Sequence, residues 1–194
     1  KRDRLGTGRL ARRHLLMVLA IMMPMSLICS GMGVAADHLW NQLIDYQPWL
    51  RGFDEVQAME VIRQLIEQTS IPVLVVVVAV LPAFGEGLVF RGVIGRALVA
   101  RYGVVPGVLA TSMLFAMAHL HPVHAVAIFP LGIVLHLLYL VTRSIWAPIL
   151  LHFLNNAWAI VATKLSDSSS MPQLADDEPV PLILSIAAIC SVAV

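Results

Sequence analysis

The sequence predicts an all-α fold, a polytopic membrane bundle of about six transmembrane helices, and three observations predict it. Of the 194 residues, 59% are hydrophobic and 13% are charged, and the mean hydropathy is +0.83. A soluble domain carries roughly 25% charged residues. Apolar stretches recur along the chain, each near the roughly 20 residues that cross a bilayer. Basic and acidic residues are also segregated into different connections.

The apolar stretches place the helices in order. The expected spans are 14–36, 71–98, 104–121, 123–142 and 145–163, and a last one starts near 182. Residues 54–70 have charged and apolar side chains at helical spacing, which predicts an amphipathic helix at the membrane surface or in water. Three regions result: an N-terminal anchor with its connector (1–70), a core (71–163), and an acidic loop with a final helix (164–194).

The charges on the connections predict the orientation. The connection 37–70 and the loop 164–181 are acidic, whereas basic residues lie at the N-terminus and after the second and fourth spans. Because basic connections stay in the cytoplasm, we expect a cytoplasmic N-terminus, and the composition suggests a bacterial plasma membrane. An alternative interpretation treats 1–36 as a signal peptide cleaved after Val34-Ala35-Ala36, although this apolar stretch is long for one.

Composition also excludes some partners. The basic N-terminal run flanks an apolar segment, so it indicates a membrane anchor beside the lipid bilayer and not a nucleic-acid site. Cys29 and Cys190 lie in separate apolar segments and imply no disulfide.

Four polar residues stand inside the apolar stretches: Glu86, His119, His152 and Asn156. Even on lenient scales, an ionisable group at the centre of a membrane helix costs about 2.5–3.5 kcal/mol. Such residues are therefore expected to pair, to face a cavity or to do chemistry.

The spacing of these residues allows a catalytic or a structural role. His152 and Asn156 are four residues apart, so they share a helix face and can donate to one oxyanion. They can equally join neighbouring helices by hydrogen bonds. Glu86 in an apolar helix can act as a general base or acid near neutral pH, or be a paired structural residue.

Depth along the spans predicts which of these residues meet. Glu86 lies 15 residues after Ile71, about 22 Å, and His152 lies 7 residues after Ile145, about 10 Å. Since these spans run in opposite directions through a core about 30 Å thick, the two residues are expected at a similar depth.

His119 fits this depth poorly. Either its helix begins late, between Pro106 and Ala110, or the helix is tilted or re-entrant. His119 can also be an interior histidine, or form a small metal cluster with His121 and His124.

Three segments resemble the CPBP intramembrane metalloprotease family, the CAAX-processing and bacteriocin-processing (Abi) proteins. The family motifs are Glu-Glu-x-x-x-Arg followed by Gly, then Phe-x-x-x-His, then His-x-x-x-Asn. The matching residues are Glu86, Phe90, Arg91 and Gly92; Phe115 and His119; and His152 and Asn156. The resemblance covers about residues 70–163, and three motifs in order on separate spans are specific.

The resemblance implies an intramembrane endopeptidase acting on membrane-bound or lipid-associated peptides. Glu86 would activate water and His119 would orient it, while His152 and Asn156 would form an oxyanion hole. The supporting residues would be Phe90, Arg91 and Phe115. We expect no cofactor, because a metal-independent glutamate mechanism is implied and no His-Glu-x-x-His demands zinc or another divalent metal. Prenylated CAAX peptides are the eukaryotic substrates of the family.

One position departs from the family pattern. Gly87 replaces the second Glu, which would pair with Arg91 four residues later. Glu86 is about 140° around a regular helix from Arg91 and is not expected to replace it. Arg91 is therefore expected to snorkel toward the interface or to find another acceptor. Gly85 and Gly87 also weaken the helix by about 1 kcal/mol each.

Gly87 motivates an alternative function, a catalytically impaired member that acts as a membrane immunity or scaffold protein. A transporter or proton pathway is less well supported, because no pair of broken-helix repeats is visible. No Gly-x-Ser-x-Gly motif supports a serine protease.

Overall fold

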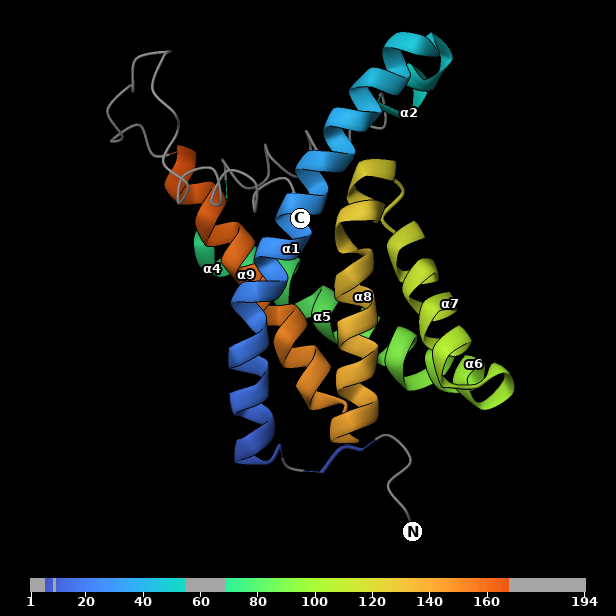
Figure 1. The fold of residues 1–194 in the computed structure, drawn as a ribbon. Coiled ribbons are helices and arrows are strands. Elements are labelled where there is room, and N and C mark those ends of the chain that lie inside the picture. The colour runs from blue at the N-terminus through green and yellow to red at the C-terminus, as the bar shows by residue number, and fades with distance from the viewer. Residues whose placement is uncertain (1–5, 9, 55–68, 168–194) are drawn as a thin grey trace.

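The computed structural model describes residues 6–8, 10–54 and 69–167, and these ranges form helices without any strand (Figure 1). The predicted fold class, an all-α membrane helix bundle, is confirmed. The predicted amphipathic helix over 54–70 falls almost entirely outside the described residues, as do most of the acidic loop and the span from 182.

Five helical stretches make up the described part of the chain. The first is α1 (Arg12–Tyr46), followed by the short η1 (Pro48–Leu50) and α2 (Arg51–Asp54). The second runs without a break through α4 (Ile71–Leu74), η2 (Val75–Val80), α5 (Leu81–Glu86), η3 (Gly87–Ile94) and α6 (Gly95–Tyr102). The others are α7 (Val104–Met117), α8 (Pro122–Thr142) and α9 (Trp146–Asp167).

Three of these stretches are long and apolar enough to cross a membrane, namely Arg12–Tyr46, Ile71–Tyr102 and Pro122–Thr142. Val104–Met117 and Trp146–Ala162 are apolar but shorter. Large apolar side chains remain exposed on the outside, including Val93 at 67%. A broad apolar surface of this kind suits contact with lipid, so the chain is an integral membrane protein.

Helix α8 lies at the centre of the bundle and packs against α1, α7 and α9 (Figure 1). The buried core follows from this arrangement, since it combines Met25 of α1, Phe115 of α7, Leu135 of α8 and Leu151 of α9. The long second helix contacts α9 through η2 and folds back on α7 through α6. Within the described residues, the buried interior therefore lies between α1, α7, α8, α9 and the second helix.

The second helix is not a regular α-helix. Both η2 and η3 are π-helical, with backbone bonds from residue i to residue i+5. In such a turn, residues five apart approach the same side of the helix. The 140° separation expected between Glu86 and Arg91 assumed a regular helix, and it is wrong here because η3 begins at Gly87.

Glycine allows α6 and α7 to pack closely. A Cβ atom built on Gly107 would lie 2.6 Å from Cα and 2.7 Å from the backbone nitrogen of Val99. Backbone cannot move aside as a flexible side chain can. This hairpin therefore depends on the missing side chain at residue 107.

We expect Gly107→Ala to destabilise the bundle by about 1–3 kcal/mol, the usual cost of overpacking. The measurement is thermal unfolding of the purified protein in detergent. Gly31→Ala is the matched control, because nothing lies within 4 Å of a Cβ at that helical position. The control should be neutral or stabilising by up to about 1 kcal/mol. Equal melting temperatures for Gly107→Ala and the unmodified chain would contradict this account of the hairpin.

Candidate active site

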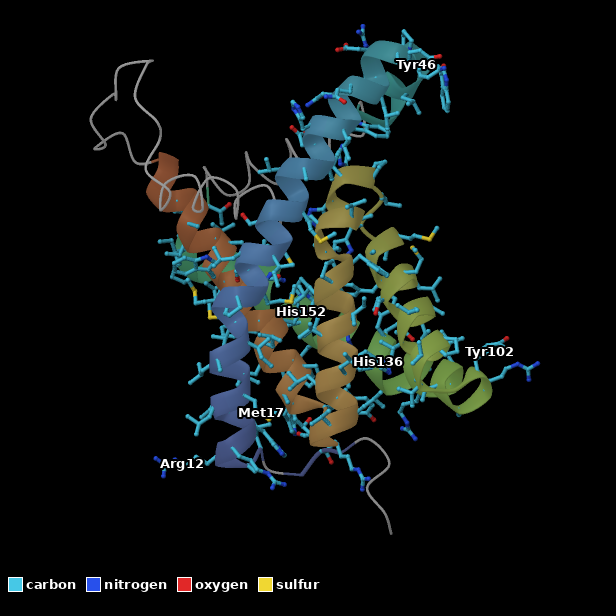
Figure 2. All side chains as sticks on the ribbon, in the orientation of Figure 1. Arg12, Met17, Tyr46, Tyr102, His136 and His152 are labelled. Carbon is cyan, nitrogen blue, oxygen red and sulfur yellow. The ribbon has the colours of Figure 1, made fainter. Side chains whose placement is uncertain are left out.

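The first and third motifs meet inside the bundle. Oε2 of Glu86 lies 3.9 Å from Nε2 of His152. Glu86 ends α5, and His152 lies in the second turn of α9, within the bundle (Figure 2). The side chain of His152 is buried, whereas that of Glu86 is 31% exposed. Their proximity agrees with the similar depth expected from the sequence.

The gap between these two atoms is too long for a direct hydrogen bond, which needs about 2.5–3.2 Å. Oε2 of Glu86 has no hydrogen-bond partner among the described residues. This oxygen of the carboxylate is therefore not held by a hydrogen bond to the protein, and it remains able to accept a proton.

A cavity of about 170 Å³ lies beside this pair. All four residues predicted as catalytic line it. The polar lining side chains are Glu86, His119, His124, His152, Asn155 and Asn156. The rest of the wall is apolar, with contributions from α7 and α8. A cavity with an apolar wall and a few convergent polar groups is typical of a substrate site.

His119 reaches the cavity from the turn that follows α7. That helix begins at Val104, so of the two alternatives the late start is wrong, and it ends at Met117, before the histidine. The ring Nδ1 lies 2.9 Å from the backbone oxygen of Phe115. Because a carbonyl oxygen only accepts, Nδ1 donates its hydrogen, and Nε2 of the neutral ring is left as an acceptor.

Phe115 is the shared neighbour of the motif residues. Its ring centroid lies 5.2 Å from that of His119, 5.7 Å from that of His152 and 5.4 Å from that of Phe90. The guanidinium carbon of Arg91 lies 4.5 Å from the same centroid. One buried ring therefore holds both histidines and the arginine in fixed relation.

Arg91 is buried, with 1% of its surface exposed. The expectation that it snorkels to the interface is wrong, because it lies on the inward side of η3 against Phe115. Its Nε and Nη1 have no hydrogen-bond partner within the described ranges. Glu86 attracts this charge without forming a direct ion pair with it.

Gly87 occupies a position where a side chain does not fit. A Cβ atom there would lie 2.7 Å from Cγ1 of Ile149 on α9. Where the family motif has its second Glu, this chain has glycine, and α9 approaches η3 closely at that position. The helix continues through both glycines and changes to π-helical geometry at Gly87.

Asn156 joins α9 to the second helix. Its Nδ2 donates to the backbone oxygen of Val78 at 3.1 Å. Val78 belongs to the π-helical η2, and Pro82, four residues later, has no N–H with which to form an α-helical bond to this oxygen. A carboxamide nitrogen has two hydrogens, so the second one remains for a ligand. The two interpretations of Asn156, helix joining and donation, are therefore compatible.

Sequence reasoning missed two buried polar residues. Asn155 lines the cavity, and its Oδ1 accepts a hydrogen bond from Oγ of Ser26 at 3.1 Å. His136 of α8 is fully buried against Gly95 (Figure 2). The argument from the cost of polar groups in lipid, which singled out Glu86, applies equally to both and would have found them.

Within the described ranges, no three or more His, Cys, Asp or Glu side chains group in a way that could hold a metal ion. The rings of His119 and His124 lie 5.1 Å apart, but His121 contacts Trp40 instead of completing a cluster.

Two comparisons with known proteins found matches. Residues 68–158 match the family described as "Type II CAAX prenyl endopeptidase Rce1-like". The chain is also 25% identical over 92 residues to the "Putative membrane peptidase YdiL" of Bacillus subtilis (strain 168). This alignment covers 47% of the chain and 38% of the relative, so the chain matches well under half of that protein's length. No solved structure matches.

The family match includes Glu86, Arg91, His119, His152 and Asn156. These are the residues on which the resemblance was based, and the structure brings four of them to one cavity. These matches support the predicted resemblance: the segment 68–158 is similar to the family of type II CAAX prenyl endopeptidases.

Proposed function

We propose that the protein is an intramembrane endopeptidase that hydrolyses peptide bonds of membrane-associated substrates with water activated by Glu86. The observation that carries this proposal is the cavity itself. It brings the unpartnered carboxylate oxygen of Glu86 to within 3.9 Å of His152, beside His119 and Asn156. A base, an acceptor and hydrogen-bond donors around one cavity are the groups that peptide hydrolysis requires.

The reaction begins with a water molecule beside Glu86. The carboxylate takes one proton from the water, and the oxygen attacks the carbonyl carbon of the scissile peptide bond. His119 accepts the second hydrogen of this water at Nε2, because Nδ1 is committed to the carbonyl of Phe115. The water is thereby oriented before attack.

The attack places a negative charge on the former carbonyl oxygen. His152 donates to it when Nε2, the nitrogen on the side of Glu86, carries the hydrogen. Asn156 donates its second Nδ2 hydrogen, while Val78 keeps the amide in place through the first. The C–N bond then breaks as Glu86 returns its proton to the leaving nitrogen, which yields a carboxylic acid and an amine.

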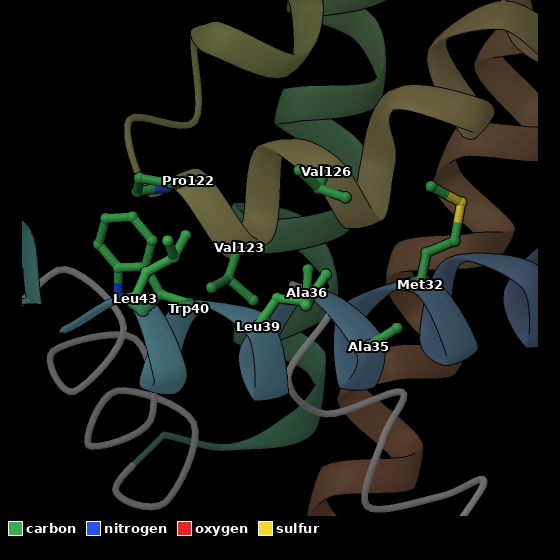
Figure 3. A pocket seen from close by; sticks show the side chains of 9 residues that line it. All are labelled: Met32, Ala35, Ala36, Leu39, Trp40, Leu43, Pro122, Val123 and Val126. Atoms are coloured by element: carbon green, nitrogen blue, oxygen red, sulfur yellow. The ribbon is translucent and has the colours of Figure 1, made fainter. Parts of the chain in front are cut away.

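A second cavity suggests where an apolar part of the substrate lies. This groove of about 310 Å³ is lined only by apolar side chains of α1 and the first turns of α8 (Figure 3). Its wall includes Val123, next in sequence to His124 of the catalytic cavity. Because the matched family is described as a prenyl endopeptidase, we propose that a lipid group attached to the substrate occupies this groove.

A specific observation favours the alternative function as well. Gly87 removes the carboxylate that the family places beside Arg91, and Ile149 fills the space. A chain with this change can serve as a binding or scaffold protein of the membrane. The proposed orientation, with the N-terminus in the cytoplasm, applies to either function.

We expect Glu86→Gln to abolish cleavage of a quenched fluorescent peptide library by the purified chain in detergent, because an amide cannot take the proton from water. His119→Ala and His152→Ala should lower turnover by about 10²–10⁴-fold. Asp37→Asn, a change at an exposed carboxylate on α1, is the matched control. Activity should not depend on a chelator. Full cleavage by Glu86→Gln would refute the proposed mechanism.

We expect Gly87→Ala and Ile149→Ala to be coupled in a double-mutant cycle of thermal stability. Each single change destabilises, and the double variant should be more stable than the sum predicts by at least about 1 kcal/mol, because Ile149→Ala creates the space that Gly87→Ala needs. Gly85→Ala is the control and should be additive, since nothing lies within 4 Å of its Cβ position. Additivity at Gly87 would contradict the contact.

The Ile149→Ala variant can also distinguish the endopeptidase function from the scaffold function. Gly87→Glu introduced together with Ile149→Ala restores a carboxylate beside Arg91 in the space that the smaller side chain leaves. If this variant cleaves peptides that the unmodified chain does not, the natural chain is the impaired member. If both cleave, the endopeptidase is the function.

We expect Ala36→Trp to fill the apolar groove and to lower kcat/KM for a farnesylated peptide at least tenfold, since each displaced methylene loses about 0.8 kcal/mol of burial. The same peptide without the farnesyl group should be cleaved at an unchanged rate. Ala20→Trp, at an exposed position of α1 outside the groove, is the control. An equal loss for both peptides would show that the groove does not hold the lipid.

A further inference from the structure

Helix α1 contacts a residue of the cavity wall through one hydrogen bond. Oγ of Ser26 lies 3.1 Å from Oδ1 of Asn155, and both residues are buried. Asn155 lines the cavity on α9, three residues after His152 and directly before Asn156. Ser26 lies outside 68–158, in a part of the chain that the family match does not cover.

The hydrogen bond from Ser26 determines which atom of the Asn155 amide remains available to a ligand in the cavity. Oδ1 is occupied, so the two N–H groups of Nδ2 are the unused hydrogen-bonding capacity of Asn155. Nδ2 of Asn155 makes no hydrogen bond within the described residues. It is also absent from the set of fully buried side-chain atoms without a partner, so part of its surface is exposed. Since Asn155 contributes to the cavity wall, this donor group is accessible there.

A role confined to joining helices would leave two donors unused at low polarity, which is unfavourable. The hydrogen-bonding groups around the cavity match those of a peptide backbone. Glu86 and His119 accept hydrogen bonds, and Asn156 already donates one of its hydrogens to Val78. A peptide inside the cavity brings carbonyl oxygens that need donors beyond the one at the reacting bond.

We propose that Asn155 is a substrate-binding residue, whose Nδ2 donates to a backbone carbonyl of the bound peptide next to the scissile bond. Ser26 is a positioning residue that acts through Asn155 by holding its Oδ1. The hydroxyl of Ser26 also lies 3.1 Å from the backbone oxygen of Met22, so its one hydrogen is shared between two acceptors. This inference rests on the proposed peptidase function.

The test measures kcat and KM separately for a peptide that the unmodified chain cleaves, on the full chain in detergent. Asn155→Ala should raise KM about five- to tenfold, the effect of one lost neutral hydrogen bond, and leave kcat within about twofold. Ser26→Ala should raise KM less, about two- to fourfold, because the amide remains but is less well oriented. Ser26→Thr keeps the hydroxyl and should restore the original KM.

Two further variants separate binding from structure. The double variant of Ser26→Ala and Asn155→Ala should have the KM of Asn155→Ala alone, since Ser26 acts only through that amide. Ser30→Ala is the matched control: Ser30 is a buried serine of the same helix whose hydroxyl has no partner in the described part of the chain. Its KM should be unchanged.

The outcomes are distinguishable. An unchanged KM in Asn155→Ala, with or without a lower melting temperature, overturns the inference and leaves the proposed function intact. Multiplicative effects of the two changes on KM overturn the positioning role of Ser26. Absence of cleavage by the unmodified chain, with farnesylated and unmodified peptides alike, overturns the proposed function and the inference with it.

Discussion

A charged guanidinium is buried inside the bundle, and its burial constrains the residues around it. Arg91 has no carboxylate beside it at Gly87, and removing such a charge from water costs several kcal/mol unless it is compensated. The compensation comes from the face of Phe115 and from the attraction of Glu86. Because the same ring contacts His119 and His152, the packing that stabilises the arginine also fixes the geometry of the candidate site.

Close approach of helices makes this arrangement possible. Lipid competes with apolar side chains, so membrane helices associate through tight packing and hydrogen bonds rather than through the hydrophobic effect. Gly87 admits Ile149, and Gly95 admits His136, at distances that no side chain would allow. The hydrogen bond from Asn156 to the backbone oxygen of Val78 adds a polar contact between α9 and the second helix. Glycine thus brings the motif residues together without contributing chemistry.

Much of the site could be predicted, because depth in a membrane is a simple function of position along a helix. Counting residues placed Glu86 and His152 at a similar depth, and they lie 3.9 Å apart. The burial of Arg91 was not predictable in this way, since a period of 3.6 residues was assumed and η3 is π-helical. The partner of Asn155 depends on tertiary packing of α1, although two adjacent asparagines in an apolar helix were a visible signal.

The most direct test of the account is the fate of oxygen in a single turnover in water enriched in ¹⁸O. Excess protein is mixed with a cleavable peptide, and mass spectrometry measures the label in the new carboxylate and in the segment that contains Glu86. If Glu86 activates water, the product carries one ¹⁸O atom and Glu86 carries none. If Glu86 itself attacks the peptide carbonyl, a mixed anhydride forms, and water that opens it at the glutamyl carbon leaves the label on the protein and none in the first product. Label on Glu86 with an unlabelled product would contradict the proposed mechanism.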